Sequence, residues 1–320
     1  MRSFKKIYSF RFRLVLGGLI WLGWSMFNFQ SPLHANWGRM LLLLAPLVIV
    51  PLALNLLSNS PFLPKALFIK KIEKWTLPAA ACLVVAYMLS QGALAGALAL
   101  PWLAVTLAVA WLGISSIHIL RTDTSLLAVS LGMAYLSVGG LWAVADRMGW
   151  RPLDYDPEIV FLTVAHFHYA GFVLPIVAGF VLGEIKNGLA KVMGYGILIG
   201  VWLVAAGIVA SQMGGGPTLE SFAAWWLATA AILLAFFQIK IALRRGTPAN
   251  VAVCFTIAGV ALLAGMLLAG LYGMRHVYPI PGLDIPMMRA LHGSANVFGF
   301  GVFAILGWWL YMFEKGELAE

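Results

Sequence analysis

Ten long apolar runs constrain the fold of this chain more than any other feature of its sequence. A helix needs about 20 residues to cross the hydrocarbon core of a bilayer, and the runs approach or exceed that length. They cover approximately residues 13–30, 39–58, 76–94, 99–120, 124–146, 158–182, 190–211, 219–243, 250–273 and 287–312. Because backbone groups cannot stay unpaired in lipid, continuous runs of this kind predict helices rather than the alternating strands of a barrel. The sequence therefore predicts an all-α integral membrane bundle of about ten spans, forming a single domain over residues 1–320.

The composition excludes most alternatives to a membrane protein. Hydrophobic residues make up 62% of the chain and charged residues only 10%, whereas a soluble domain carries about 25% charged residues. A water-soluble enzyme, a nucleic-acid-binding domain and a disordered protein are therefore not expected. Cys82 and Cys254 lie in separate apolar runs, so neither a disulfide framework nor a thiolate metal site is predicted.

The distribution of basic residues predicts the orientation. With an even number of spans the two termini share one side of the membrane, and that side holds sixteen of the 21 Lys and Arg residues. The opposite side holds Arg39, Arg147, Arg151, Arg275 and Arg289. By the positive-inside rule both termini are expected in the cytoplasm. The net charge of +9 is thus a topology signal, and membrane lipids rather than nucleic acids are the expected partners.

The first apolar run has some features of a secretory signal. It follows a basic segment, as a signal peptide would. However, Leu33 stands where a cleavage site after Ala35 needs a small residue. We therefore expect a retained first helix.

Polar side chains gather in the connections on the side opposite the termini. They include His34, Asp146, Asp154, Asp156, Glu158, Gln212, Glu220, His276, Tyr278 and Asp284. Several of these connections are also rich in glycine and proline, for example residues 214–217 and 279–282. Such loops are expected to cap a cavity, although ordinary surface polarity is the preferred interpretation of the acidic run at 154–158.

Two histidines lie within the sixth span. His166 is expected about 12 Å and His168 about 15 Å inside its outer end. Two residues on a helix are separated by about 200°, so the two imidazoles face nearly opposite ways. They cannot jointly hold one metal ion on an unbroken helix. Either each serves a different site, or one faces a cavity while the other bonds to a neighbouring helix.

A third buried histidine lies in the tenth span. His292 is expected about one turn inside Arg289, and Asn296 continues the same face four residues later. Polar groups inside spans usually have a partner or a function. The glycines at 293, 299 and 301 permit close helix packing or the approach of a flat cofactor, and packing is the preferred interpretation.

Two windows resemble helices of haem–copper oxidase subunit I. The first is Val164-Ala165-His166-Phe167-His168-Tyr169, and the second runs from Arg289 through Leu291, His292 and Ser294 to Phe298-Gly299-Phe300-Gly301. The resemblance implies that His168 and His292 are axial ligands of a b-type haem, that His166 faces a second site and that Arg289 contacts the propionates. The chain lacks the copper-binding histidines of that family, so oxygen reduction is not expected.

As a whole the chain resembles the YndJ-like family of bacterial membrane proteins. The resemblance rests on Arg151-Pro152-Leu153 leading into Glu158-Ile159-Val160, on the His-Phe-His-Tyr-Ala-Gly-Phe core and on the late Leu-His-Gly…Asn…Gly-Phe element. It implies a polytopic fold in the inner membrane of a bacterial cell and no particular activity.

Three functions remain open from the sequence. In the first, haem b or a transition metal is bound in the outer half of the bilayer in a redox or sensing role. Its ligands and contacts would be His168, His292, Arg289 and Asn296, with His166 or His34 as further metal ligands. In the second, a membrane-embedded enzyme uses His166 or His292 with Asp146, Glu220 or Asp284 for acid–base chemistry on a lipid or isoprenoid. The third is a transporter or a partner-binding subunit.

Overall fold

The computed structural model describes residues 2–60, 66–120 and 123–316, and these form helices without any strand. The long helical segments are α1 (Arg2–Asn28), α2–η1–α3 (Ala35–Asn59), α4 (Ala66–Met88), α5 (Ala93–Leu120), α6 (Thr124–Met148), α7–η3–α8 (Pro157–Glu184), α9 (Gly188–Gln212), α10 (Thr218–Ala242), α11 (Ala249–Gly273) and α12–η4–η5–α13 (Ile285–Glu314). A short 3₁₀ turn, η2, covers Pro152–Asp154. The predicted all-α bundle is confirmed.

Eight of these segments in the described chain are both long and apolar enough to cross a membrane, and α1 and α4 are not among the eight. The largest boundary errors concern the start of α1, at Arg2 rather than 13, and α4, which occupies Ala66–Met88 rather than 76–94. The sequence analysis began this span after its charged residues. In the structure, however, Glu73 is buried and pairs with Arg13 of α1, so these charges belong to the helix itself.

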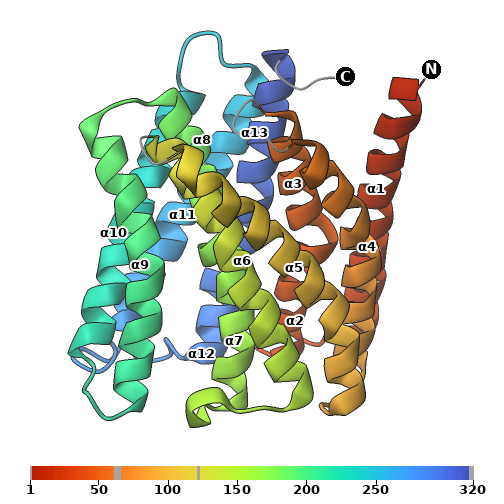
Figure 1. The fold of residues 1–320 in the computed structure, drawn as a ribbon. Helices are drawn as coiled ribbons and strands as arrows, with labels where there is room; N and C mark the ends of the chain where they lie inside the picture. Colours follow the sequence, from red (N-terminus) through yellow and green to blue (C-terminus); the bar gives the residue numbers. More distant parts are fainter. Residues whose placement is uncertain (1, 61–65, 121–122, 317–320) are drawn as a thin grey trace.

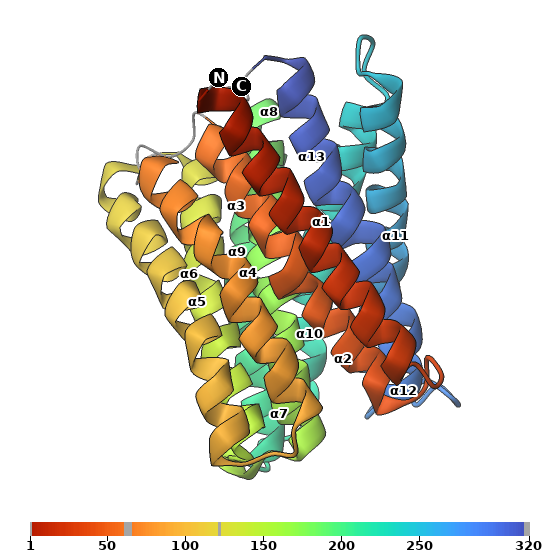
Figure 2. The ribbon, with the colours of Figure 1, turned by 90° about the vertical axis from the view of Figure 1, so that its right-hand side faces the viewer.

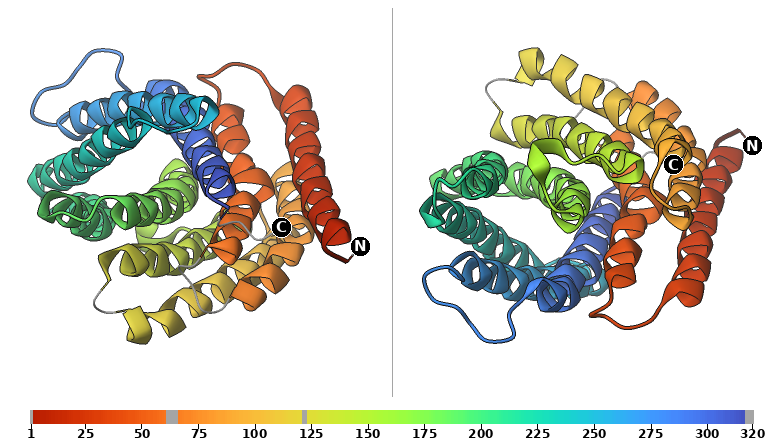
Figure 3. Two further views of the ribbon diagram at one scale, coloured as in Figure 1. Left: turned by 90° about the horizontal axis from the view of Figure 1, so that it is seen from above. Right: turned by 90° about the horizontal axis from the view of Figure 1, so that it is seen from below.

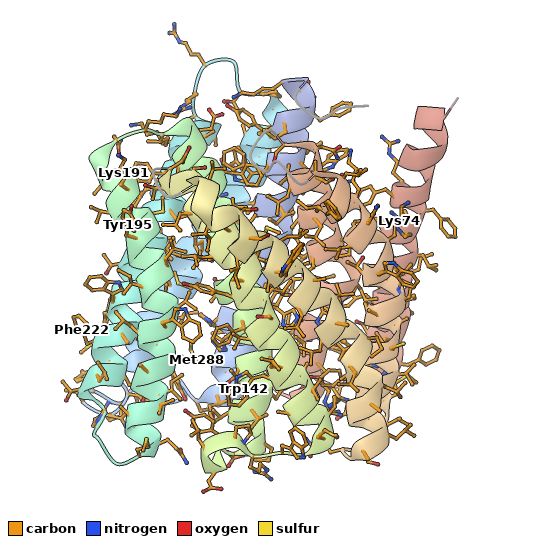
Figure 4. The ribbon with its side chains drawn as sticks, viewed as in Figure 1. Lys74, Trp142, Lys191, Tyr195, Phe222 and Met288 are labelled. Carbon is orange, nitrogen blue, oxygen red and sulfur yellow. The ribbon has the colours of Figure 1, made fainter. Side chains whose placement is uncertain are left out.

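Both termini lie at the same end of the bundle, as predicted (Figures 1 and 2). We call this the terminal end, and the opposite end the distal end. Lys191 and Tyr195 of α9 lie toward the terminal end, whereas Trp142 and Met288 lie toward the distal end (Figure 4). The assignment of the terminal end to the cytoplasm stays a prediction.

The sixth span, α7–η3–α8, occupies a central place in the bundle. Figure 3 shows that α9, α10, α11 and α13 form an arc on one side of it. The α5–α6 hairpin lies on its other side, and α1 lies at the edge of the bundle beside α4. Two spans carry the intramembrane histidines, α7–η3–α8 and α12–η4–η5–α13. They are close neighbours at the distal end, because Glu158 of α7 pairs with Arg289 just after α12.

Three spans contain π-helical segments near their middle. These segments are η1 (Ala45–Ile49), η3 (Tyr169–Val173), η4 (Arg289–Gly293) and η5 (Ala295–Val302). Of these, η1, η3 and η5 converge at Gly301, where an added Cβ would lie 3.4 Å from Tyr169 Cε1 and 3.5 Å from Ile49 Cδ1. Tyr169 also donates its hydroxyl hydrogen bond to the carbonyl of Leu41. Because π-turns inside helices frequently occur at functional sites, these three spans are the natural place to look for one.

Two adjacent glycines test whether α1 is an integral part of the bundle. A Cβ on Gly17 would lie 2.2 Å from the carbonyl oxygen of Leu47, whereas a Cβ on Gly18 would meet nothing within 4 Å. We expect Gly17→Ala to lower the free energy of unfolding by about 1–3 kcal/mol, the usual effect of overpacking. Gly18→Ala is the matched control and should leave stability unchanged or raise it. Thermal unfolding in detergent measures both, and equal stabilities would contradict the packing of α1.

Candidate functional site: a histidine pair between two spans

Both ring nitrogens of His168 are engaged, one by its own helix and one by a neighbouring helix. Its Nδ1 lies 2.7 Å from the carbonyl of Val164, and Trp102 of α5 donates its indole N–H to Nε2 over 2.9 Å. The imidazole is fully buried and stacks on the Trp102 ring with centroids 5.8 Å apart. Since neither nitrogen is left for a ligand, His168 links α7 to α5.

His166 faces the other way and contacts His292. The two ring centroids lie 6.4 Å apart with an angle of 26° between the planes. The expectation that the two histidines of α7 face opposite sides is therefore confirmed, and it is His166, not His168, that the structure brings to His292. The His166 side chain is exposed and His292 is half-buried, so the pair remains accessible from beside α7.

The hydrogen bonds of this pair fix its tautomers. Nδ1 of His166 lies 2.7 Å from the carbonyl of Leu162, and Nδ1 of His292 lies 2.8 Å from the carbonyl of Gly265 in α11. A carbonyl oxygen can only accept, so each Nδ1 carries the hydrogen when the imidazole is neutral. Both Nε2 atoms consequently keep a lone pair that is free to bind a metal ion or accept a proton.

The strip of α7 around His166 is the accessible face of that helix. The partly accessible residues of this strip are Ile159, Leu162, Thr163 and Ala170. Val164 and His168 lie on the opposite face and are buried. His166 therefore lies on an accessible strip that begins near the distal end of the bundle and continues toward its middle.

Asn296 and Gly265 fix the position of His292. The Asn296 amide donates to the carbonyl of His292 over 2.8 Å, and its nitrogen also lies 3.2 Å from His292 Nδ1. A Cβ on Gly265 would lie 2.3 Å from the same amide nitrogen. Only glycine therefore lets α11 come close enough for its carbonyl to reach the imidazole. Asn296 acts as a positioning residue for His292.

Arg289 ties the distal ends of three segments together. Its Nη1 donates to Glu158 Oε1 over 2.8 Å and its Nη2 donates to the carbonyl of Leu33 over 2.9 Å. The side chain is almost completely buried. This guanidinium joins α12 to the start of α7 and to the α1–α2 connection, and it is not available for haem propionates.

The glycines of the last span serve helix packing, which is the interpretation that the sequence favoured. A Cβ on Gly293 would lie 2.9 Å from Leu41, and one on Gly299 would lie 2.3 Å from Ala261. They do not leave a slot for a flat ring. Together with the engaged nitrogens of His168 and the engaged Arg289, this means that the residues assigned to haem by resemblance do not fit that role.

The three candidate acid–base carboxylates each have another partner. Asp146 pairs with the adjacent Arg147 at 3.0 Å, Glu220 pairs with Arg275 at 2.7 Å, and Asp284 caps α12 by accepting from the backbone N–H of Met287. In the part of the chain that the structure describes, none of them has a hydrogen bond or ion pair to His166 or His292.

The other predicted metal ligand, His34, is the N-cap of α2. Its Nδ1 accepts a hydrogen bond from the backbone N–H of Asn36 over 3.1 Å. Among the described residues no group of three or more His, Cys, Asp or Glu side chains is arranged to hold a metal ion. The His166–His292 pair would therefore supply two protein ligands, and the rest of a coordination sphere would come from elsewhere.

The α6–α7 connection is a structured loop, as expected for the distal end. Leu153 and Asp154 adopt positive φ angles of 57° and 55°, and Tyr155 is buried with its ring centroid 6.0 Å from that of Trp142. Burial raises the pKa of Tyr155, and the charge of Glu220 raises it further. The loop thus brings the connections before α7 and α10 close together.

Two partners of the histidines were missed by the sequence analysis. Trp102 lies in a wholly apolar run, and nothing in the sequence indicates which helix its indole contacts. Gly265 acts through its backbone carbonyl, which no residue type reveals. A glycine within a span marks a close helix approach, and this was the one weak signal that the sequence offered for Gly265.

A family model described as "YndJ-like protein" matches residues 40–300, which include both His166 and His292. The chain belongs to the YndJ-like family. It is also 28% identical over 183 residues to a protein of Bacillus subtilis (strain 168) named "Uncharacterized membrane protein YndJ". That alignment covers 57% of this chain and 32% of the relative, so the chain spans about a third of that longer protein. No solved structure matches the chain. Membership of this family thus agrees with the assignment of the chain as a multi-pass membrane protein.

Proposed function

We propose that His166 and His292 together bind a transition-metal ion in the distal half of the membrane. The observation that carries the proposal is that both Nδ1 atoms bond to backbone carbonyls while both Nε2 atoms remain free. Histidines that bind metals almost always donate their second ring N–H in this way, which fixes the ring and raises the basicity of the ligating nitrogen. Neutral imidazole suits zinc, copper, iron and nickel.

The number of ligands favours an open site. Structural zinc sites are closed by four protein ligands, whereas catalytic sites keep at least one position for water or substrate. A centre held by two imidazoles leaves room for an exogenous ligand, and the accessibility of His166 supports this interpretation. A redox, sensing or transfer role therefore has more support than a purely structural one.

The charge of the site favours an ion of low charge. Both imidazoles are neutral in the tautomers described above, and the neighbouring Arg289 and Glu158 neutralise each other. An uncompensated double charge is costly to place in an apolar bundle. Cu⁺ is therefore a better candidate than Zn²⁺, unless an anion enters with the divalent metal.

The location follows from the distribution of basic residues. Their excess in the connections at the terminal end favours a cytoplasmic position for that end. The histidine pair would then lie in the outer half of a bacterial inner membrane and open toward the periplasmic side.

Metal analysis of the purified protein tests this proposal. We expect about one copper or zinc ion per chain after incubation with Cu⁺ or Zn²⁺ and removal of the excess, because two histidines form one centre. His166→Ala and His292→Ala should each lose the ion. His276→Ala is the matched control, because His276 lies in the distal α11–α12 connection and is partly exposed. Protein without bound metal, or equal metal content in all four forms, would refute the proposal.

Transport of the metal is the second candidate function. It is supported by the π-helical interruptions in three spans that meet at Gly301, since discontinuous spans often surround the binding sites of transporters. Uptake of the metal into vesicles that contain the protein would distinguish transport from binding alone. The acid–base enzyme has less support, because its three carboxylates are engaged elsewhere.

A further inference from the structure

A second candidate site lies at the terminal end, far along the bundle from the histidine pair. A cavity of about 210 Å³ opens there between the α10–α11 connection and the end of α13. Its lining includes Arg244, Arg245, Pro248, Tyr311, Glu314 and Lys315. The inference does not depend on the proposed metal centre.

The lining of this cavity carries an excess of positive charge. Glu184 binds two of its three cations, Arg244 at 3.4 Å and Lys315 at 2.6 Å. Glu314 is the other carboxylate nearby. Arg245 is exposed and has no hydrogen bond or ion pair within the described chain. Among the described residues three cations thus face two carboxylates, and one guanidinium is left to bind an anion.

The cation at the end of α13 is held in place and stays charged. Lys315 lies 4.4 Å above the Tyr311 ring, and the Tyr311 hydroxyl donates to Glu184 over 3.1 Å. Burial lowers the pKa of Lys315, but its bonds to Glu184 and Tyr311 and their charges outweigh that effect, so the pKa is raised. Lys315 is therefore protonated at neutral pH and fixed at the cavity wall.

The start of α11 adds to the positive potential. Pro248, which also lines the cavity, is the N-cap of this 25-residue helix and offers no side-chain bond to its first N–H groups. Such a helix start carries a partial positive charge that favours anions, phosphate in particular. The dipole supplements the side-chain cations without creating the site alone.

We propose that this cavity binds a phosphate group, and that the group belongs to an anionic phospholipid. Arg244 lies two residues after the end of α10 and Lys315 directly follows α13, so the cavity lies at the level of lipid headgroups. Leu243, next to the cations, is 77% exposed and offers an apolar contact for an acyl chain. Guanidinium groups are well suited to phosphate because they present several donors in one plane.

Native mass spectrometry of the purified full chain tests this assignment with dioleoyl phosphatidylglycerol, dioleoyl phosphatidylcholine and inorganic phosphate as separate additions. We expect phosphatidylglycerol to bind the wild type more tightly than phosphatidylcholine. Each Lys or Arg at an anionic lipid strengthens binding by about fivefold. The double variant Arg245→Gln/Lys315→Gln should therefore bind phosphatidylglycerol about 30-fold more weakly.

Lys191→Gln is the matched control, because Lys191 is exposed at the same end of the bundle on α9 (Figure 4). It should bind phosphatidylglycerol like the wild type. Arg245→Gln alone guards against misfolding, since this side chain has no partner to lose among the described residues, and it should bind about fivefold more weakly. Unchanged lipid binding in Arg245→Gln and in the double variant would overturn the site. Displacement of phosphatidylglycerol by equimolar inorganic phosphate would overturn the lipid assignment in favour of free phosphate.

Discussion

Replacing Asp146 with alanine is expected to lower the free energy of unfolding by about 3–5 kcal/mol, the usual effect of leaving one charge of a buried ion pair alone. Asp146 and Arg147 are both almost completely buried, and the carboxylate oxygen lies 3.0 Å from the Arg147 Nε. The other contacts of the guanidinium are weaker. Its Nη1 lies 3.4 Å from the carbonyls of Ala86 and Leu89, and it lies 4.3 Å from the Tyr87 ring. Without Asp146 the remaining contacts leave a positive charge uncompensated inside the bundle.

The double variant Asp146→Ala/Arg147→Met separates this effect from lost packing. Removing both charges of a buried pair is often nearly neutral, so the double variant should regain most of the stability lost in Asp146→Ala. Thermal or denaturant-induced unfolding in detergent provides the comparison. If the double variant is as unstable as the single one, the loss comes from the packing around Asp146 and not from the isolated charge.

Removing either His166 or His292 is expected to weaken metal binding by at least about 100-fold, whereas removing His168 should not change it. Mutation of groups that merely support a metal ligand commonly reduces metal affinity 10–100-fold. The loss of one of the two ligands themselves should reduce the affinity by more than that. His168 uses both nitrogens within the protein. Its replacement by alanine should therefore lower stability by about 1–3 kcal/mol through the unpartnered Trp102 indole.

Isothermal titration of the three variants with Cu⁺ and Zn²⁺, paired with thermal unfolding of the metal-free proteins, measures both quantities. The informative pattern is the separation between affinity, which follows His166 and His292, and stability, which follows His168. An affinity that falls in His168→Ala as strongly as in His292→Ala would instead support the pairing implied by the haem–copper oxidase resemblance.

Much of the fold was predictable because lipid leaves few choices for the backbone. Continuous apolar runs located the helices to within a few residues, and the even number of spans placed both termini at one end. The exceptions were the starts of α1 and α4, where charges were taken as a helix boundary. A buried partner on another helix, Arg13 for Glu73, allows charges inside a span, and a local pattern does not reveal such a partner.

The candidate site was only partly predictable for a related reason. Helix geometry correctly separated the faces of His166 and His168. It did not indicate which face meets the last span and which meets Trp102, because that depends on how the helices are arranged around α7. The same limit applies to the carboxylates. Asp146, Glu220 and Asp284 lie at the expected end of the bundle, but their partners are fixed by tertiary contacts and by a helix cap.

X-ray absorption spectroscopy of the protein loaded with whichever of Cu⁺ or Zn²⁺ binds more tightly tests the central claim most directly. Two imidazole nitrogens should appear in the first shell at about 2.0 Å from the metal, with the outer-shell scattering typical of histidine. In His166→Ala and in His292→Ala, each loaded at a metal concentration that overcomes its weaker binding, the imidazole signal should fall to one ring, and it should stay at two in His168→Ala. A first shell without imidazole, or one that keeps two rings when either His166 or His292 is removed, would contradict a metal site built on this pair.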